Sequence, residues 1–135
     1  MSTYRTLNHS KFLLKYHIIF VCKYRRKLLV QYGSCMKQIM LDIASTSDFS
    51  IDEMEVDEDH IHLLIESVPK LSPLQIVRKL KQTSTSRIYK LYPEIADEFN
   101  TDKKIFWSRS YFAASISDGL DTETVTAYIK NQGKE

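Results

Sequence analysis

Apolar positions change their spacing along the first half of the chain, and each change predicts a different element. The run 16–22 is β-branched and aromatic with both faces largely apolar, which predicts a central strand covered on both sides. A helix is expected to start with Ser34 as its N-cap, because apolar side chains then recur at helical spacing, and to end in the polar run 45–48. Residues 49–56 and 60–65 predict two further strands, and the short acidic link between them indicates an antiparallel hairpin.

The second half of the chain predicts a long helix, a strand and a last helix. The long helix is expected to start at Ser72, with a hydroxyl at the N-cap and proline next, and to end before Pro93. A strand is expected over 105–114, bent or split near 108–110, and a last helix over 121–133. The apolar face of the long helix is expected to hold Val77, Leu80, Ser84, Ile88 and Leu91.

This element order, β-α-β-β-α-β-α, predicts an α+β fold. It describes a ferredoxin-like or RRM-like split βαβ antiparallel sheet, with helices on one face and a C-terminal helix that carries Tyr128. With 135 residues, three glycines, three prolines and no linker-like segment, the chain is expected to be a single domain over 1–135. Because RNA-recognition domains share this architecture, the fold alone does not decide the function.

Composition narrows the setting in which the protein works. A hydrophobic fraction of 43% and a charged fraction of 27% are ordinary for a globular protein. No apolar run reaches the roughly 20 residues of a membrane span, and the first residues lack the pattern of a signal peptide. The two cysteines, Cys22 and Cys35, have no CxxC spacing and agree with a reducing compartment. We therefore expect a cytoplasmic protein with no membrane partner.

Charge is distributed unevenly along the chain. The segment 52–59 holds six acids and no base, and setting these aside changes the net charge from +2 to +8. Much of the positive charge lies in 23–27 and in 78–90, which suggests a surface for a polyanion beside an acidic neighbourhood. A solvated charged face would explain either cluster alone, whereas two clusters with aromatic residues between them favour nucleic acid.

His60 and His62 form the sharpest local motif. Residues i and i+2 of a strand point to the same face about 7 Å apart, so two imidazoles can converge on one divalent ion. Two ordinary strand histidines would give the same pattern. His9 is expected to be exposed, and His17 to be a packed or hydrogen-bonded structural residue. Candidates for a carboxylate that orients an imidazole or supplies an outer-shell oxygen are Asp57, Asp59 and Glu66.

Tyr128 and Gln132 form a second motif. At helical spacing i, i+4 they share a face, so a phenol and an amide oxygen could address the same metal-bound phosphate. A tyrosine that attacks phosphorus stores the energy of the broken bond in a phosphotyrosine, so the strand can be resealed without ATP. Packing of Tyr128 beside Val125 and Ile129 is the alternative, and the chain has eight tyrosines.

Five segments link the two motifs. Their order and spacing closely resemble those of the HUH-type single-tyrosine transposases of the smallest insertion sequences, which move as single-stranded DNA. The likeness extends from about Tyr16 to Gln132. It is carried by the segments 16–20, 23–27, 59–64, 106–112 and 128–132.

The resemblance implies a role for each motif. His60 and His62 would bind Mg²⁺ or Mn²⁺, with Gln132 as a third ligand, and the metal would polarise and orient the scissile phosphate. Tyr128 would attack, giving a 5′-phosphotyrosine and a free 3′-hydroxyl for strand transfer. Zn²⁺ also suits two imidazoles and could occupy the site without supporting turnover.

The resemblance also implies partners. Such transposases are homodimers whose sheets join, the tyrosine helix of one subunit can complete the histidine site of the other, and they recognise single-stranded DNA with hairpin ends. The long helix departs from many relatives, since 81–87 is rich in serine and threonine where they carry glycine and lysine. The candidate DNA contacts are Arg25, Arg26, Lys27, Arg78, Lys79, Lys81 and Arg87.

Two other classes of function compete with DNA cleavage and strand transfer. One is a domain that binds single-stranded nucleic acid or hairpins without cutting, for which the spacing of Tyr128 and Gln132 serves no purpose. The other is a small metallohydrolase that uses water as its nucleophile, with Tyr128 as packing. Replacing Tyr128 by phenylalanine separates them, because binding and hydrolysis would survive while strand cleavage would be lost.

Overall fold

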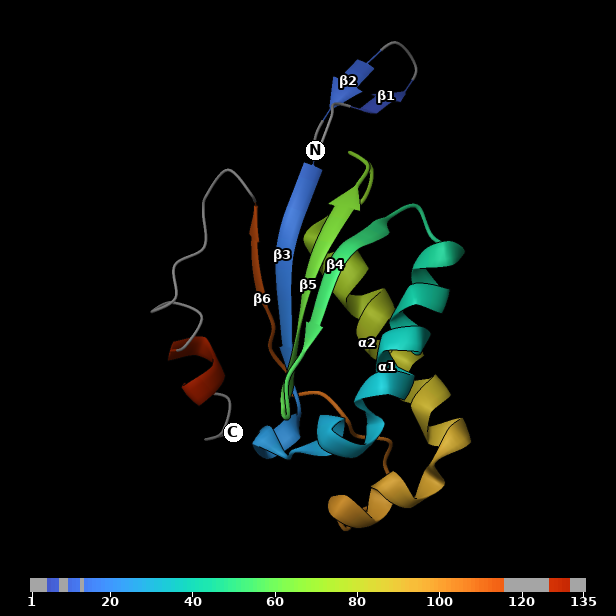
Figure 1. The fold of residues 1–135 in the computed structure, drawn as a ribbon, viewed down its shortest axis with the longest axis vertical. Helices are drawn as coiled ribbons and strands as arrows, with labels where there is room; N and C mark the ends of the chain where they lie inside the picture. Colours follow the sequence, from blue (N-terminus) through green and yellow to red (C-terminus); the bar gives the residue numbers. More distant parts are fainter. Residues whose placement is uncertain (1–4, 8–9, 13, 116–126, 132–135) are drawn as a thin grey trace.

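A four-stranded antiparallel sheet with the order β4-β5-β3-β6 forms the centre of the molecule (Figure 1). The computed structural model describes residues 5–7, 10–12, 14–115 and 127–131. Residues 127–131 form a short helical stretch. The elements are β1 Arg5–Leu7, β2 Ser10–Phe12, β3 Leu14–Val21, the 3-10 helix η1 Lys23–Arg25, α1 Leu28–Ser45, β4 Ser50–Val56, β5 His60–Ser67, α2 Pro73–Leu91, the 3-10 helix η2 Pro93–Glu98 and β6 Phe112–Ser115.

The predicted α+β order is confirmed, including the antiparallel hairpin of β4 and β5. Helices α1 and α2 cover one side of the sheet, and the stretch 127–131 lies beyond β6 on the other (Figure 1). The predicted last helix over 121–133 is described only in this stretch, and Gln132 and Gly133 lie outside the described residues. Pairing of β1 with β2, and the turns η1 and η2, were not predicted. None of the described helices is long and apolar enough to span a membrane.

The N-cap of helix α1 is Lys27, seven residues before the predicted one, so the assignment of Ser34 as N-cap is wrong. Leu28, Leu29 and Tyr32 are already buried at helical spacing, and Ser34 is exposed within the helix. The first turn is tied to the β4-β5 link by a hydrogen bond from the Leu29 amide to the Glu58 carbonyl. This tertiary contact extends the helix where the local sequence offered a later capping residue.

Helix α2 begins where the sequence predicted. The Ser72 hydroxyl accepts a hydrogen bond from the Gln75 amide, and the Gln75 side chain accepts one from the Ser72 amide, which completes a capping box. One predicted core position is wrong, because Leu91 is 59% exposed at the end of the helix. Ile76 and Tyr89 are buried instead.

The predicted strand over 105–114 forms a ladder only at its end, over β6. Before it, Trp107 makes a single bridge to Cys22. The carbonyls of residues 108–110 accept hydrogen bonds from the ammonium of Lys81. These contacts lie at the bend that the sequence indicated, between the bridge at Trp107 and the ladder of β6.

Candidate active site

His60 and His62 lie on the face of β5 that points away from α1 and α2. Along β5 the intervening residues Ile61 and Leu63 are buried in the core, whereas both histidines are partly exposed. The predicted shared face is therefore observed. In the sheet His62 pairs with Ile19 of β3, and Ile19 pairs in turn with Phe112 of β6. Directly paired residues share a face, so His62 and Phe112 belong to one row across the sheet.

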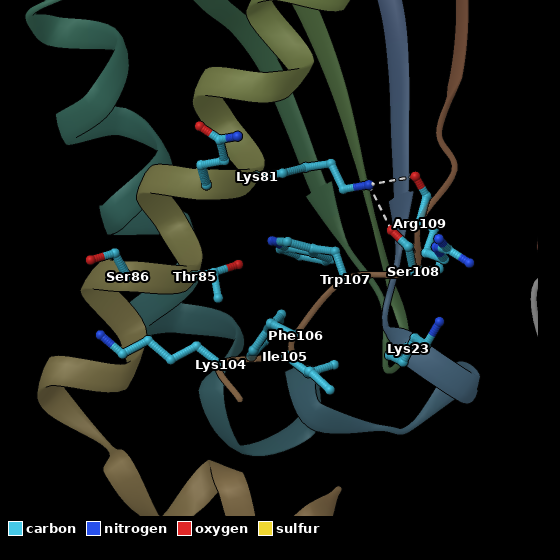
Figure 2. Close-up of a pocket in the computed structure, with 11 residues that line it drawn as sticks. Lys23, Lys81, Thr85, Ser86, Lys104, Ile105, Phe106, Trp107, Ser108 and Arg109 are labelled. Atoms are coloured by element: carbon cyan, nitrogen blue, oxygen red, sulfur yellow. Dashed lines mark hydrogen bonds between the residues drawn. The ribbon is translucent and has the colours of Figure 1, made fainter. Parts of the chain in front are cut away.

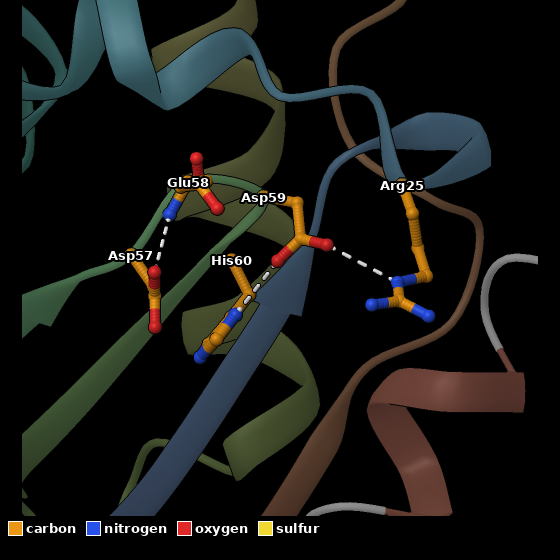
Figure 3. A network of polar contacts seen from close by, with 5 residues as sticks. All are labelled: Arg25, Asp57, Glu58, Asp59 and His60. Carbon is orange, nitrogen blue, oxygen red and sulfur yellow. Dashed lines mark hydrogen bonds and ion pairs between the residues drawn. The ribbon is translucent and has the colours of Figure 1, made fainter.

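His60 is oriented by a carboxylate, as the sequence suggested. Its Nδ1 lies 2.9 Å from Oδ1 of Asp59, and Oδ2 of Asp59 accepts a hydrogen bond of 3.1 Å from Nε of Arg25 (Figure 3). Burial opposes ionisation of Asp59, but the hydrogen bonds from His60 and Arg25 outweigh it and hold the pKa of this carboxyl below its usual range. With Nδ1 held by Asp59, Nε2 of His60 is the ring nitrogen left to face a ligand.

Arg25 reaches Asp59 through a turn that the sequence did not reveal. Tyr24 and Arg25 have φ angles of 57° and 53°, in the left-handed region that residues other than glycine rarely adopt. The end of β3 is held beside the acidic link by a hydrogen bond of 2.8 Å from the Cys22 amide to the Asp59 carbonyl. Together these features turn a predicted DNA contact, Arg25, toward a carboxylate of the same chain.

His62 contacts a third histidine. Its Nε2 lies 3.0 Å from Nδ1 of His17, and the two ring centroids are 5.2 Å apart. Burial lowers the pKa of His62, and the neighbouring His17 lowers it further. The sequence predicted a packed or hydrogen-bonded role for His17, which is what the structure shows, but nothing in the pattern indicated that its partner would be His62.

Tyr128 lies against the β6 edge of the same sheet. Its ring centroid is 5.9 Å from that of Phe112, and its hydroxyl is 3.2 Å from the hydroxyl of Ser110. The backbone around Ser110 is fixed by Lys81, whose Nζ donates to the carbonyls of Ser108 at 2.6 Å and of Arg109 and Ser110 at 3.2 Å each. A chain of contacts thus runs from α2 through Ser110 to the phenol.

The donor set fits a divalent metal site completed from outside the histidine pair. Two imidazoles share a face, and the one with its Nδ1 on a carboxylate has the arrangement common among metal-binding histidines. Within the described residues no three histidine, cysteine, aspartate or glutamate side chains come together to hold a metal. Further ligands would have to come from Gln132, which lies outside the described residues, or from a phosphate of the substrate.

The candidate DNA contacts divide into two sets. Arg25 is paired with Asp59, and the ammonium of Lys81 is engaged by three backbone carbonyls. Arg87 on α2 is half-buried. The remaining candidates have exposed side chains: Arg26, whose guanidinium lies 5.8 Å from the ring centroid of Phe99, with Lys27, Arg78 and Lys79.

Sequence comparison links the chain to known transposases. The family described as "Transposase IS200 like" matches residues 10–132. The transposase for insertion sequence element IS200 of Salmonella typhimurium is 31% identical over 138 residues, which cover 100% of this chain and 87% of that protein. The ISDra2 transposase TnpA of Deinococcus radiodurans is 31% identical over 120 residues, covering 88% of this chain and 84% of the relative.

Solved structures agree. A crystal structure described as a transposase of Deinococcus radiodurans R1 superposes with a TM-score of 0.82 at 26% identity, covering 95% of this chain and 97% of that one. A REP-associated tyrosine transposase bound to a REP hairpin has the same fold, with a TM-score of 0.56 at 14% identity over 96% of this chain and 68% of its own. The chain belongs to the IS200-like transposase family.

Proposed function

We propose that this transposase cleaves and rejoins single-stranded DNA with the hydroxyl of Tyr128 as its nucleophile, beside a divalent metal ion held by His60 and His62. One observation carries the proposal. Tyr128 packs on Phe112, which lies in the same row of the sheet as His62 with only Ile19 between them. Since neighbouring strands lie about 4.8 Å apart, the backbone positions of His62 and Phe112 are roughly 10 Å apart on one face. A phosphate between them could address both motifs.

In the proposed reaction, a phosphodiester phosphorus of the DNA is transferred from a 3′-oxygen to the phenolic oxygen of Tyr128. The phenolic oxygen of Tyr128 forms a bond to phosphorus while the bond between phosphorus and the 3′-oxygen breaks. The phenol loses one proton, and the leaving 3′-oxygen gains one to become a hydroxyl. The resulting 5′-phosphotyrosine retains the energy of the cleaved bond, so attack by another 3′-hydroxyl reseals a strand without an external energy source.

His60 and His62 would hold Mg²⁺ or Mn²⁺ through imidazole nitrogens, with Gln132 as a further ligand. When bound there, such an ion would supply Lewis-acid polarisation of the scissile phosphate. Asp59 keeps the ring of His60 in place, and Arg25 keeps Asp59 ionised and oriented. Ser110 holds the phenol of Tyr128 at the edge of the same face.

The partner proposed for this site is single-stranded DNA that carries a hairpin near its end. The solved relative bound to a REP hairpin has the same fold, and exposed cations on α2 and between η1 and α1 offer contacts to the DNA backbone. We also expect a homodimer, because β4 and β6 are edges of the sheet within the described residues and either can pair with a second copy. Its mass in solution would be twice 15.8 kDa.

The test uses labelled single strands from both DNA flanks of the gene, mixed with protein and Mn²⁺ or Mg²⁺. We expect a denaturation-resistant protein–DNA adduct that requires the metal and maps to Tyr128. Tyr128→Phe should abolish the adduct while leaving hairpin binding within about twofold of wild type. Tyr111→Phe is a matched control, because it removes another phenol close to the same edge and should leave the adduct intact. Cleavage retained in Tyr128→Phe would count against the proposal and favour water as the nucleophile.

The same assay separates an active site within one chain from a site shared between subunits. Contacts of Tyr128 with Ser110 and Phe112 of its own chain favour a site within one chain. A mixture of His62→Ala with Tyr128→Phe should then stay inactive. Activity restored by mixing would show that the tyrosine of one subunit serves the histidines of the other.

A further inference from the structure

A cavity of about 660 Å³ lies between α2 and the segment 104–109, beside the sheet (Figure 2). One wall comes from α2, with Gln82, Thr85 and Ser86, and the other comes from the segment 104–109. Lys23 adds to the rim from the turn after β3. The volume falls within the range of about 300–1,000 Å³ that is usual for small-molecule and cofactor sites.

The charge of the cavity selects an anion. Among the described residues that line it there are four cations and no acid. The ammonium of Lys81 is engaged by the carbonyls of 108–110, so it fixes the wall (Figure 2). Lys104 and Arg109 are exposed on the rim and can contact phosphate without breaking such an arrangement.

The inner wall is apolar, aromatic and held in place. Phe106 and Trp107 are almost completely buried, and their rings meet edge to face with centroids 4.7 Å apart. The indole of Trp107 donates a hydrogen bond of 3.0 Å to the hydroxyl of Ser84 on α2. Because only 1% of Phe106 and 6% of Trp107 is exposed, these side chains form a fixed floor and offer no open ring face for stacking, so a nucleotide would be held by the polar groups and the cationic rim around that floor.

The α2 wall supplies polar groups at helical spacing. Gln82, Thr85 and Ser86 are at positions i, i+3 and i+4, so their amide and hydroxyl groups line one stripe of the helix. In Figure 2 the side chain of Thr85 points toward the aromatic wall. Amide and hydroxyl groups can both donate and accept hydrogen bonds, as the edge of a nucleobase requires.

From these features we infer that the cavity binds one unpaired nucleotide of the DNA strand, with the edge of its base against the polar groups of α2 and its phosphates on Lys104 and Arg109. The inference rests on the proposed function for the identity of the strand. It places a base-reading site on the α2 side of the edge segment whose next residue, Ser110, holds Tyr128. DNA bound there would pass over Arg109 toward the phenol.

The experiment uses Tyr128→Phe protein, which binds without cutting, and the hairpin-bearing strands from the gene's flanks. Abasic sites are placed one at a time along the unpaired part of the strand, and affinity is measured at constant salt. We expect one position at which loss of the base weakens binding about tenfold, the size expected when one or two hydrogen bonds to the base edge are lost. When 2-aminopurine is placed at the same position, its fluorescence should change on binding.

Variants connect that position to the cavity. Thr85→Phe fills it, and Gln82→Ala removes a polar group without adding bulk, so the second variant serves if the first fails to fold. Both should weaken binding of the intact strand and shrink the abasic penalty at the sensitive position to less than about twofold. Lys90→Ala is the matched control on α2, because Lys90 is exposed and does not line the cavity.

An abasic penalty that persists unchanged in Thr85→Phe and Gln82→Ala would overturn the inference, as would the absence of any sensitive position in a strand that binds tightly. A third contrary outcome combines two results: Lys104→Ala weakens the binding of every strand equally, and both α2 variants keep the abasic profile of the parent protein. This would overturn the inference, because it indicates that the cavity contacts only the DNA backbone. Failure of the proposed function is distinguishable, since wild-type protein would then form no adduct while the abasic profile could still be measured.

Discussion

The hydroxyl of Tyr128 lies 3.2 Å from the hydroxyl of Ser110, on a segment whose backbone is fixed by Lys81 from α2. Ser110 is only two residues before Phe112, the ring on which Tyr128 packs. The phenol is therefore held at two points, one polar and one aromatic, against the β6 edge. These two contacts define where the phenol of Tyr128 rests on the protein.

Ser110→Ala should slow the formation of the Tyr128 adduct about three- to tenfold, the worth of one hydrogen bond. Single-turnover cleavage at saturating DNA measures this rate apart from binding, and hairpin affinity should not change. Ser110→Thr keeps a hydroxyl and should recover most of the rate. A rate in Ser110→Ala equal to wild type would show that the contact does not position the nucleophile.

Lys81→Met should lower the free energy of unfolding by about 1–3 kcal/mol, because carbonyls of residues 108–110 lose their charged donor. Thermal or urea unfolding measures the loss. Lys79→Met is the control on the same helix, since its side chain is exposed and the change should stay within about 0.5 kcal/mol. Equal stability of the two variants would mean that water replaces Lys81 at no cost.

Asp59→Ala should weaken binding of Mn²⁺ about 10- to 100-fold, the usual effect of losing the partner that orients a metal-binding histidine. Mn²⁺ electron paramagnetic resonance or titration calorimetry gives the affinity without DNA or turnover. Arg25→Ala should have a smaller effect, because it touches the carboxylate and not the imidazole. Unchanged Mn²⁺ affinity in Asp59→Ala would argue that His60 needs no orienting group, or that it binds no metal.

Parts of the site that depend on local spacing could be predicted from the sequence. The strand period places His60 and His62 on one face, and the nearby acids gave Asp59 as one of three candidate partners. The role of Arg25 could not be predicted, because it depends on two successive residues with positive φ that no glycine marks. The contact of His17 with His62 could not be predicted either. The two residues are 45 positions apart and meet only because of the register of β3 and β5.

The errors in the predicted elements have the same origin. Ser34 had the properties of an N-cap, yet burial of Leu28 and Leu29 against the sheet extends α1 toward the N-terminus. Residues 105–114 were expected to form a strand, yet after the bridge of Trp107 to Cys22 the carbonyls of 108–110 contact Lys81 of α2. In both cases a contact with a distant element outweighed a local preference. The spacing of Tyr128 and Gln132 drew attention to Tyr128, but the resemblance was needed to link it to the histidines, because any of eight tyrosines could have packed at a sheet edge.

The stability of the metal-free protein should depend on pH through His62. Burial and the neighbouring His17 lower its pKa in the folded state below the value of about 6.5 expected when unfolded. As the pH falls through 6.5, the unfolded chain therefore takes up a proton more readily than the folded protein, and the free energy of unfolding decreases. The decrease cannot exceed about 1.4 kcal/mol per pH unit for one proton.

Urea unfolding at pH 8, 7, 6 and 5 measures this dependence, and His62→Gln should have a shallower slope than wild type over the same range. Carboxylates with lowered pKa values, such as Asp59, lose their contribution only at lower pH and do not interfere. Bound Mn²⁺ should steepen the dependence, because protons compete with the metal for the imidazoles. Identical slopes in wild type and His62→Gln would show that the contact with His17 does not bias the protonation of His62.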